Sequence, residues 1–320
     1  MSLSTRVQQN EENLMLDVAI AYIVFNRPHL TEQSFSVIKK LKPSKLFVIA
    51  DGPRSSFSED EKLCKKVREI TENIDWPCQI HRKYSKNNLG LKKNIGSGLN
   101  WVFEHVEDAI ILEDDCIPHP DFFTFCCTML NKYRNDKRIG VITGDNYQNG
   151  RRRGDASYYF SKYGHCWGWA TWREEWLNYC ENIVFWEHWS QSEHWKKYTA
   201  DQVERQYWSV IFDKVSRGEI DSWAYPWQAC LWYNDKLTVT PVVNLVSNIG
   251  VGPEATHTKS SRVLNLGQNT GALGQITHPS LIMQNVDADA YTFNYHYGGA
   301  KHKFPQIIKY VFFKLMQLFK

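Results

Sequence analysis

Strand-like and helix-like segments alternate along residues 18–146, and this alternation is the strongest constraint that the sequence places on the fold. Short, continuous apolar runs bounded by turn residues are typical of buried strands, and the segments between them have helical character. The pattern predicts βαβ units and a largely parallel sheet. The expected strands cover 18–25, 46–52, 78–84, 109–115 and 139–146, and the expected helices cover 28–41, 58–73, 90–106 and 121–134, the second of them capped by Ser58.

The remainder of the chain has a different composition. Eleven of the 13 Trp residues lie between 167 and 232. Beyond residue 150 the alternation gives way to aromatic-rich helices, loops and a strand pair near 237–248. Most of these Trp side chains are expected to fill a core, and two or three to lie at a binding site, because aromatic faces stack on sugar rings and the indole N–H donates to hydroxyls.

Charge and cysteine content exclude several classes of protein. Lys+Arg 38 against Asp+Glu 35 gives a net charge of +3, too small for a nucleic-acid-binding surface, so no nucleic-acid partner is expected. The 8 Cys include no C-x-x-C pair and no zinc-type spacing, which favours a reducing cytoplasm and places Cys126 and Cys127 in the core. The run 151–153, three Arg, is expected to be a solvated loop, with phosphate or acceptor binding as the alternative.

The two ends of the chain also differ from each other. Residues 1–17 form a polar extension without an apolar signal core, and no run reaches the roughly 18 apolar residues of a membrane span. Residues 301–320 contain a basic, strongly apolar helical pattern over 304–320. This helix either docks on the protein or lies in the membrane interface, which would make the protein peripheral on the inner face of the cell membrane.

The ends of the expected strands indicate where a ligand would bind. In parallel α/β sheets, ligands lie beyond the carboxyl ends of the strands. This rule points to residues 26–28, 51–54 and the acidic triplet 113–115. The first strand is followed by neither G-x-G-x-x-G nor a P-loop, which disfavours dinucleotide dehydrogenases and P-loop enzymes.

Three successive carboxylates, Glu113, Asp114 and Asp115, are costly unless a positive charge meets them. On a strand, Glu113 and Asp115 would share one face and Asp114 would lie on the other. Hard oxygen ligands suit Mg²⁺ or Mn²⁺, which also take diphosphate oxygens. The alternative is an acidic strand end that caps the next helix.

Four segments in order resemble the nucleotide-sugar domain of GT-A glycosyltransferases, and in particular the group of N-acetylglucosaminyltransferase I and its bacterial relatives. They are VAIAYIVFNRP, LFVIADG, NLGLKKNIGSGLNW and AIILEDDCIPHPDFF. Later segments similar to this group are GHCWGWATWREEW, DSWAYPWQACLW and SNIGVGPEATHT. The resemblance implies a Rossmann-like, three-layer α/β/α nucleotide-diphospho-sugar transferase fold with a mostly parallel central sheet. Residues 18–150 would be its nucleotide-sugar half and 151–300 its Trp-rich acceptor half.

The same resemblance implies roles for individual residues. Asp115 would hold the metal, Mn²⁺ or Mg²⁺, with His257 as a second ligand. The residues implied at the nucleotide sugar are Arg27 near the nucleotide, Asp51 at the uracil or ribose, Glu113 or Asp114 at the ribose or sugar, and Lys92 and Lys93 at the diphosphate. For Asp51 the alternative is a β-turn Asp before Gly52.

The acceptor side is implied by the two Trp-rich segments. An inverting transferase needs a base for the acceptor hydroxyl, and Asp221 matches the Asp-Trp segment of the group, with Glu219 as the nearest substitute. The Trp residues within the matching segments, Trp167, Trp169 and Trp223, are the expected sugar contacts. His165 is a further candidate for acceptor or phosphate contact.

The expected function is therefore a metal-dependent glycosyltransferase of polysaccharide biosynthesis. It would move a sugar, in this family by default a UDP-linked N-acetylhexosamine, from a nucleotide diphosphate sugar to a glycan or lipid-linked acceptor. One rival is a sugar nucleotidyltransferase, which would need a Gly-rich basic loop where this chain has Asn-Arg-Pro-His (26–29). The other rival is a non-catalytic carbohydrate-binding or scaffold protein of the same fold.

Overall fold

The computed structural model describes residues 17–250 and 269–303. Its described residues include an eight-stranded sheet with the strand order β3-β2-β1-β4-β8-β6-β9-β7. Strands β7 and β8 run antiparallel to their neighbours, and the other strands of this sheet run in one direction. The strands are β1 (Ala19–Val24), β2 (Lys45–Ala50), β3 (Gln79–Tyr84), β4 (Asp108–Glu113), β6 (Ile139–Thr143), β7 (Tyr158–Ser161), β8 (Trp169–Trp172) and β9 (Leu237–Pro241).

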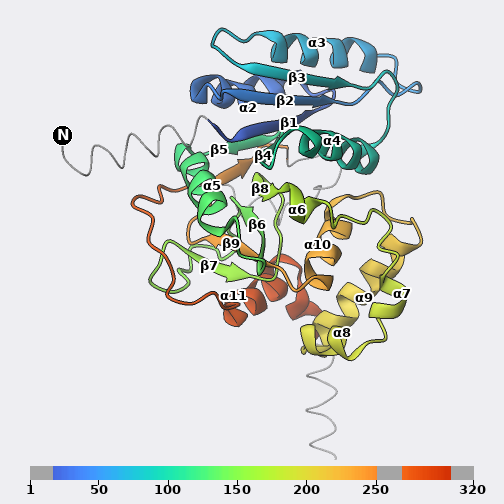
Figure 1. The fold of residues 1–320 in the computed structure, drawn as a ribbon. Helices are drawn as coiled ribbons and strands as arrows, with labels where there is room; N and C mark the ends of the chain where they lie inside the picture. Colours follow the sequence, from blue (N-terminus) through green and yellow to red (C-terminus); the bar gives the residue numbers. More distant parts are fainter. Residues whose placement is uncertain (1–16, 251–268, 304–320) are drawn as a thin grey trace, which may run out of the picture.

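Helices cover both faces of this sheet (Figure 1). One face carries α2 (Pro28–Leu41), α3 (Asp60–Glu72) and α5 (Pro120–Tyr133), and the other carries α4 (Leu91–His105), α6 (Arg173–Trp176) and α10 (Ala224–Tyr233). The predicted α/β fold with a mostly parallel central sheet is confirmed, and so are the five strands and four helices expected before residue 146. The second helix begins at Asp60 with Glu59 as N-cap and without a side-chain cap among the described residues, so the predicted Ser58 cap is wrong.

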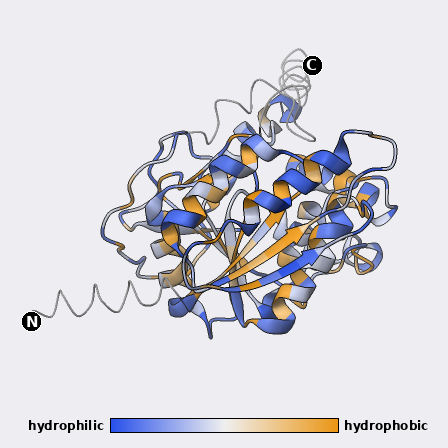
Figure 2. Cartoon of the chain, turned by 90° about the horizontal axis from the view of Figure 1, so that it is seen from above, coloured by the Kyte–Doolittle hydropathy of each residue, from blue (hydrophilic) through white to orange (hydrophobic). Residues whose placement is uncertain are grey.

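The alternation of side chains along β1 explains the two cores. Ile20 and Tyr22 pack with α2 and α5, whereas Ala21 and Ile23 pack with α4. A strand that is buried on both faces has no polar positions, which is why these strands appear in the sequence as continuous apolar runs. Figure 2 shows the apolar strands in the middle of the molecule, with helices of mixed hydropathy around them.

The Trp-rich region forms a third core beside the sheet. It is built by α7 (Trp186–Trp189), α8 (Glu193–Tyr198), α9 (Gln202–Ser216) and part of α10. The buried indoles of this cluster are Trp186, Trp189, Trp195, Trp208 and Trp232. Core packing therefore accounts for much of the Trp excess, as predicted.

The second half of the chain also contributes strands to the central sheet. Strand β8 lies between β4 and β6, so residues on both sides of position 150 share one sheet. The strands expected near 237–248 are present but do not pair with each other. β9 pairs with β6 and β7, while β10 (Val246–Asn248) pairs antiparallel with β5 (Cys116–Pro118), directly after the acidic triplet.

The chain continues into α11 (Val286–Tyr291) and the π-helix η2 (Thr292–His296), which lie by the β7 edge of the sheet. Within 17–250 and 269–303, no helix has the length and apolar character needed to span a bilayer. The polar extension up to residue 16 and the basic segment 304–320 lie outside the described residues.

Candidate active site

An arginine and two carboxylates meet at the carboxyl ends of β1 and β4. These strands are adjacent, with Ile23 opposite Glu113, so the residues that follow them are neighbours. Arg27 Nη2 donates to Asp114 Oδ1 and lies 3.0 Å from Asp115 Oδ2. Because β4 ends at Glu113, the strand alternation that was predicted to separate Asp114 from Asp115 does not apply, and both carboxylates contact one guanidinium.

Burial and mutual repulsion perturb the acids of this cluster. The pKa of Glu113 is raised to about 8 by burial and by the charges of Asp115 and Asp114. Burial also raises the pKa of Asp114 to about 6, although Arg27 acts in the opposite direction. Burial alone would lower the pKa of Arg27, but Asp114 and Asp115 raise it above its ordinary value. One arginine thus interacts with three acidic side chains and does not balance their combined charge, so a further cation would be favourable here.

One oxygen of the cluster is left without a partner. In the described part of the chain, Asp114 Oδ2 is buried and accepts no hydrogen bond. An unsatisfied buried carboxylate oxygen is costly and marks a place where a ligand or ion would be favourable.

Asp115 is supported by the β5–β10 pair. Its Oδ1 accepts from Asn248 Nδ2 at 3.2 Å, and its backbone oxygen accepts from Ile249 N at 2.8 Å. A Cβ on Gly250 would lie 2.2 Å from Asp115 Oδ2, so only glycine allows the backbone to approach this closely. His257, the other predicted metal ligand, lies outside the described residues.

The Asp51 side chain makes four hydrogen bonds within the protein. Its Oδ1 accepts from Gly52 N at 2.8 Å and Leu89 N at 2.9 Å, and its Oδ2 accepts from Asn88 Nδ2 at 2.9 Å and Gly90 N at 3.1 Å. A carboxylate has about four acceptor positions, and all of them are used here. Its side chain fixes the loop between β3 and α4, and its contact with uracil or ribose stays a prediction.

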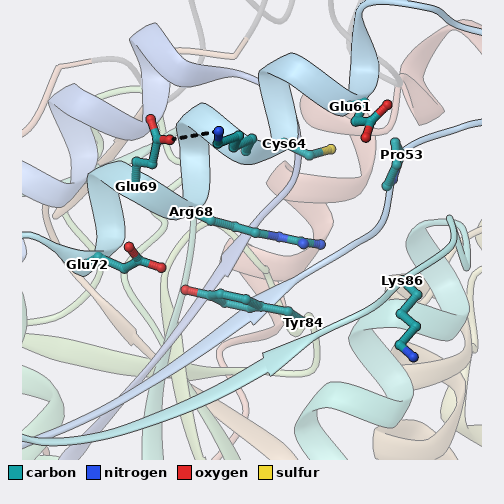
Figure 3. Close-up of a pocket in the computed structure, with 9 residues that line it drawn as sticks. Pro53, Glu61, Cys64, Arg68, Glu69, Glu72, Tyr84 and Lys86 are labelled. Carbon is teal, nitrogen blue, oxygen red and sulfur yellow. Dashed lines mark ion pairs between the residues drawn. The ribbon is translucent and has the colours of Figure 1, made fainter.

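A surface hollow of about 450 Å³ lies behind this loop (Figure 3). Arg68 Nη2 donates from the hollow to Asp51 O at 3.2 Å and Ser85 O at 2.8 Å. The Arg68 side chain in this hollow therefore helps to hold together the ends of β2 and β3. Its described lining residues, which do not include the arginine and acids of the cluster, are Pro53, Glu61, Cys64, Lys65, Arg68, Glu69, Glu72, Tyr84 and Lys86.

The two lysines of α4 are not equivalent. Lys92 is buried, and its Nζ lies 3.2 Å from Asn182 Oδ1 and 3.6 Å from Glu181 Oε1. These contacts join α4 to the chain before α7, and the role of Lys92 at a diphosphate stays a prediction. Lys93 is exposed, and its role stays a prediction.

Asp221 lies beside the loop that Asp51 holds. Its Oδ2 is 3.6 Å from the point where a Cβ on Gly90 would be, and its side chain is exposed. The fold therefore brings an acid from the second half of the chain to the carboxyl edge of the parallel strands. Glu219, the substitute candidate, pairs with Arg217 Nε at 2.6 Å on the surface.

Two of the three predicted sugar-stacking Trp residues are core residues. Trp169 and Trp223 are 1% and 3% exposed and stack on each other with ring centroids 5.4 Å apart. Because protein covers their ring faces, the prediction that they stack on a sugar is wrong. Trp167 is only partly buried, and its backbone N donates to Asp145 Oδ2 at 2.8 Å.

Sequence reasoning missed a buried polar group around Asp145. Among the described residues, Asp145 Oδ1 and His296 Nδ1 are buried without a hydrogen-bond partner. The Tyr147 ring stacks on His296 at 3.8 Å and meets His165 at 4.5 Å, and burial lowers the pKa of His296 to about 4. Asp145 follows β6, so the strand-end rule could have found it, whereas no local pattern indicates His296.

The turn that carries Trp167 lies close to the acidic cluster. Burial raises the pKa of the Cys166 thiol, and the charges of Glu113, Asp145 and Asp115 raise it further. Electrostatic influence of this kind requires these groups to be near neighbours. His165 itself is buried and neutral, because burial and His296 hold its pKa well below the ordinary value.

The acidic cluster fits a divalent cation only in part. Within the described ranges, no three His, Cys, Asp or Glu side chains are arranged to hold a metal ion. Mg²⁺ and Mn²⁺ are, however, often held by one or two carboxylates together with substrate phosphates. Asp115 and the unpartnered oxygen of Asp114 suit a cation that is shared with a diphosphate.

Comparisons with known proteins reveal no close relative. No family model matches the chain, and no curated protein matches it. The fold is similar to 4-diphosphocytidyl-2C-methyl-D-erythritol synthase from Anaerococcus prevotii DSM 20548, with 12% identity, 55% of this chain and 78% of that chain covered, and a TM-score of 0.32.

Two UDP-glucose pyrophosphorylase structures are also similar to the chain. The complex with UDP-glucose has 13% identity, covers 47% of this chain and 64% of that chain, and has a TM-score of 0.25. The apo structure has 10% identity, covers 69% of this chain and 90% of that chain, and has a TM-score of 0.30. At these scores the likenesses decide nothing about activity, and the resemblance to the N-acetylglucosaminyltransferase I group stays a prediction.

Proposed function

We propose that the protein is a glycosyltransferase that moves a sugar from a nucleotide diphosphate sugar to a glycan or lipid-linked acceptor, with Mn²⁺ or Mg²⁺ as cofactor. The observation that carries the proposal is the charge cluster at the ends of β1 and β4, where Arg27 contacts Asp114 and Asp115. Ligands of parallel α/β sheets bind at this edge. The buried, partnerless Asp114 Oδ2 within the described residues adds a reason for a cation there.

Each residue of the cluster has a part in donor binding. Asp115, with Asp114, would hold the divalent cation, which supplies Lewis-acid stabilisation of the leaving diphosphate. Arg27 orients both carboxylates and brings a positive charge to the edge that a diphosphate would approach. Lys93 is the exposed α4 cation that remains for the diphosphate.

Asp221 is the proposed general base. Its exposed carboxylate takes the proton of the acceptor hydroxyl as that oxygen attacks the anomeric carbon. The bond from the anomeric carbon to the diphosphate oxygen breaks, and the diphosphate leaves with the electron pair. Attack opposite the leaving group inverts the anomeric centre. Trp167, whose side chain is only partly buried, is the proposed sugar contact.

The test begins with donor binding by the full chain. A thermal-shift panel of nucleotide sugars, with UDP-N-acetylhexosamines first, is run with and without Mn²⁺. We expect a donor to raise the melting temperature in the presence of Mn²⁺ and Asp115→Asn to abolish this shift. Asp155→Asn, an exposed carboxylate elsewhere, is the matched control. If no nucleotide sugar stabilises the protein, or if Asp115→Asn behaves as wild type, the proposal fails.

Turnover distinguishes the proposal from its rivals. Asp221→Asn is expected to keep the donor-induced shift and to lose transfer to acceptor or water. Pyrophosphate release from a nucleoside triphosphate and a sugar 1-phosphate would instead assign a sugar nucleotidyltransferase. Donor binding without turnover in wild type would assign a non-catalytic carbohydrate-binding protein.

A further inference from the structure

The carboxylate of Asp115 is held by a side chain from the second half of the chain. Asn248 Nδ2 donates to Asp115 Oδ1 at 3.2 Å, and Asn248 Oδ1 accepts from Gly250 N at 2.8 Å. A backbone N–H can only donate, so the oxygen of the Asn248 amide must face Gly250 and its NH₂ group must face Asp115. Asn248 is also buried, so water competes little for this contact. The amide therefore has one orientation, and in that orientation it donates to Asp115.

The backbone brings Asn248 to this position. Strands β10 and β5 pair antiparallel, with Asn248 opposite Cys116, the residue that follows Asp115. Asp115 O accepts from Ile249 N at 2.8 Å, so the backbone of Asp115 is tied to the same segment as its side chain. A Cβ on Gly250 would overlap Asp115 Oδ2, so this segment also limits where the second oxygen can lie.

Strand β10 is itself anchored to the central sheet. Leu245, directly before β10, donates its N–H to Gly144 O at 2.8 Å and accepts at its O from His119 N at 2.8 Å. Gly144 directly follows β6, and a Cβ on it would overlap the Val246 side chain. The position of Asp115 therefore depends on β6 and β10 as well as on β4, the strand that precedes it.

The partners of the two Asp115 oxygens differ in charge. Arg27 Nη2 lies 3.0 Å from Oδ2, and this guanidinium is shared with Asp114. The donors at Oδ1 are the neutral Asn248 amide and the Cys116 thiol, a weak donor whose Sγ lies 3.7 Å away. An amide orients a carboxylate without cancelling the negative charge that a bound cation needs.

We propose that Asn248 is a positioning residue for the divalent cation and that it acts by fixing the orientation of the Asp115 carboxylate. The inference rests on the proposed function, in which Asp115 holds Mn²⁺ or Mg²⁺. A site that offers only one or two carboxylates depends strongly on the orientation of each. Replacing a residue that orients a metal ligand typically weakens metal binding by about 10–100-fold.

The experiment titrates Mn²⁺ into the full chain and measures the unbound ion by electron paramagnetic resonance, so that it needs no turnover. Each titration is made without nucleotide and with UDP, GDP or ADP, whichever of them wild type binds. Asn248→Ala removes the amide and is expected to raise the dissociation constant for Mn²⁺ about tenfold. Asn248→Ser, whose side chain is too short to reach Asp115, should do the same and provides the measurement if Asn248→Ala does not fold.

Asn285→Ala is the matched control. Asn285 Oδ1 likewise accepts from a backbone N–H, that of Ala288 at 2.9 Å, and Asn285 N donates to Phe160 O in β7. Strands β8, β6 and β9 lie between β7 and β4, which corresponds to roughly 19 Å at the usual strand spacing. This variant loses a structural hydrogen bond of the same kind, and we expect it to bind Mn²⁺ as wild type.

A second measurement separates positioning from a general loss of structure. A high Mn²⁺ concentration should restore the nucleotide-induced rise in the melting temperature of Asn248→Ala to the wild-type value, because mass action overcomes a weakened site. Failure of Mn²⁺ to restore that rise would overturn the inference.

The remaining outcomes distinguish this inference from the proposed function. If wild type binds Mn²⁺ and Asn248→Ala binds it equally well, the inference is wrong and the proposed function stands. If wild type binds no Mn²⁺, the inference is also wrong, and the panel of nucleotide sugars then decides whether the proposed function fails with it.

Discussion

Replacing Arg27 with Met tests whether the charge cluster is a coupled unit. The substitution keeps an apolar stem of similar length and removes the guanidinium that contacts Asp114 and Asp115. Both carboxylates then lose their cation, and the Asp114 side chain is only 3% exposed in the wild-type structure. A large loss of stability is expected, because water cannot replace the lost partner.

The size of the effect follows from burial. Removing one partner of a buried ion pair costs about 3–5 kcal/mol, because the other charge is left uncompensated. The Arg27 side chain is 29% exposed, so the lower end of this range, about 3 kcal/mol, is expected. In a chain of this size that corresponds to a fall in melting temperature of about 4–6 °C.

The assay is urea unfolding of wild type, Arg27→Met, Asp114→Asn and the double variant. Since the neutral carboxamide that Asp114→Asn introduces needs no cation, the double variant should be more stable than the sum of the single effects allows, by about 1 kcal/mol or more. Arg217→Met, which breaks an exposed pair with Glu219, is the control and should leave the stability close to that of wild type. A loss for Arg27→Met as small as that of the control, or strict additivity in the cycle, would refute the reasoning.

Three further predictions concern the loops and the core. Gly52→Ala should destabilise the protein by about 1–3 kcal/mol in urea unfolding, because the new Cβ would lie 2.4 Å from the carbonyl carbon of Asn87; wild-type stability would contradict that close approach. Asp60, whose pKa the hydrogen bond from Arg54 lowers from 3.8 to about 2, contributes stability that is present above pH 4 and lost as the pH falls toward 2. The stability difference between wild type and Asp60→Asn should therefore shrink as the pH falls from 4 to 2, and a difference that stays constant over this range would contradict the prediction. Trp169→Ala should lower the free energy of unfolding by about 3–5 kcal/mol and leave the donor-induced thermal shift of the folded fraction in place, whereas loss of that shift alone would restore a sugar-binding role.

The sequence predicted the elements well because their signals are local. Burial of β1 on both faces requires a continuous apolar run, and that run is visible at residues 19–24 without knowledge of its neighbours. The same local reasoning failed for the acidic triplet, since strand alternation was extended to Asp114 and Asp115 although β4 ends at Glu113. The end of a strand depends on its pairing partner, which the local sequence does not contain.

The sequence located the candidate residues but did not show which partners their side chains have in the folded protein. Asp51 lies at a strand end as predicted, yet its carboxylate is fully used by the loop before α4. Lys92 lies on the expected helix, but Glu181 and Asn182 engage its ammonium group. In both cases the competing partner is distant in the sequence or is a backbone N–H, and neither kind of partner leaves a pattern around the residue itself.

The sequence by itself determined the α/β class of this protein and the edge of the sheet at which its charged residues gather. Both follow from periodicity and from the geometric rule that parallel strands end together. Only the tertiary structure decided which of these side chains are exposed to solvent and which are engaged by other parts of the protein. It left Asp221 exposed, set Arg27 between two carboxylates, and closed the faces of Trp169 and Trp223 against protein. The physical reason is that hydrogen-bond satisfaction and burial depend on segments that only the completed fold brings together.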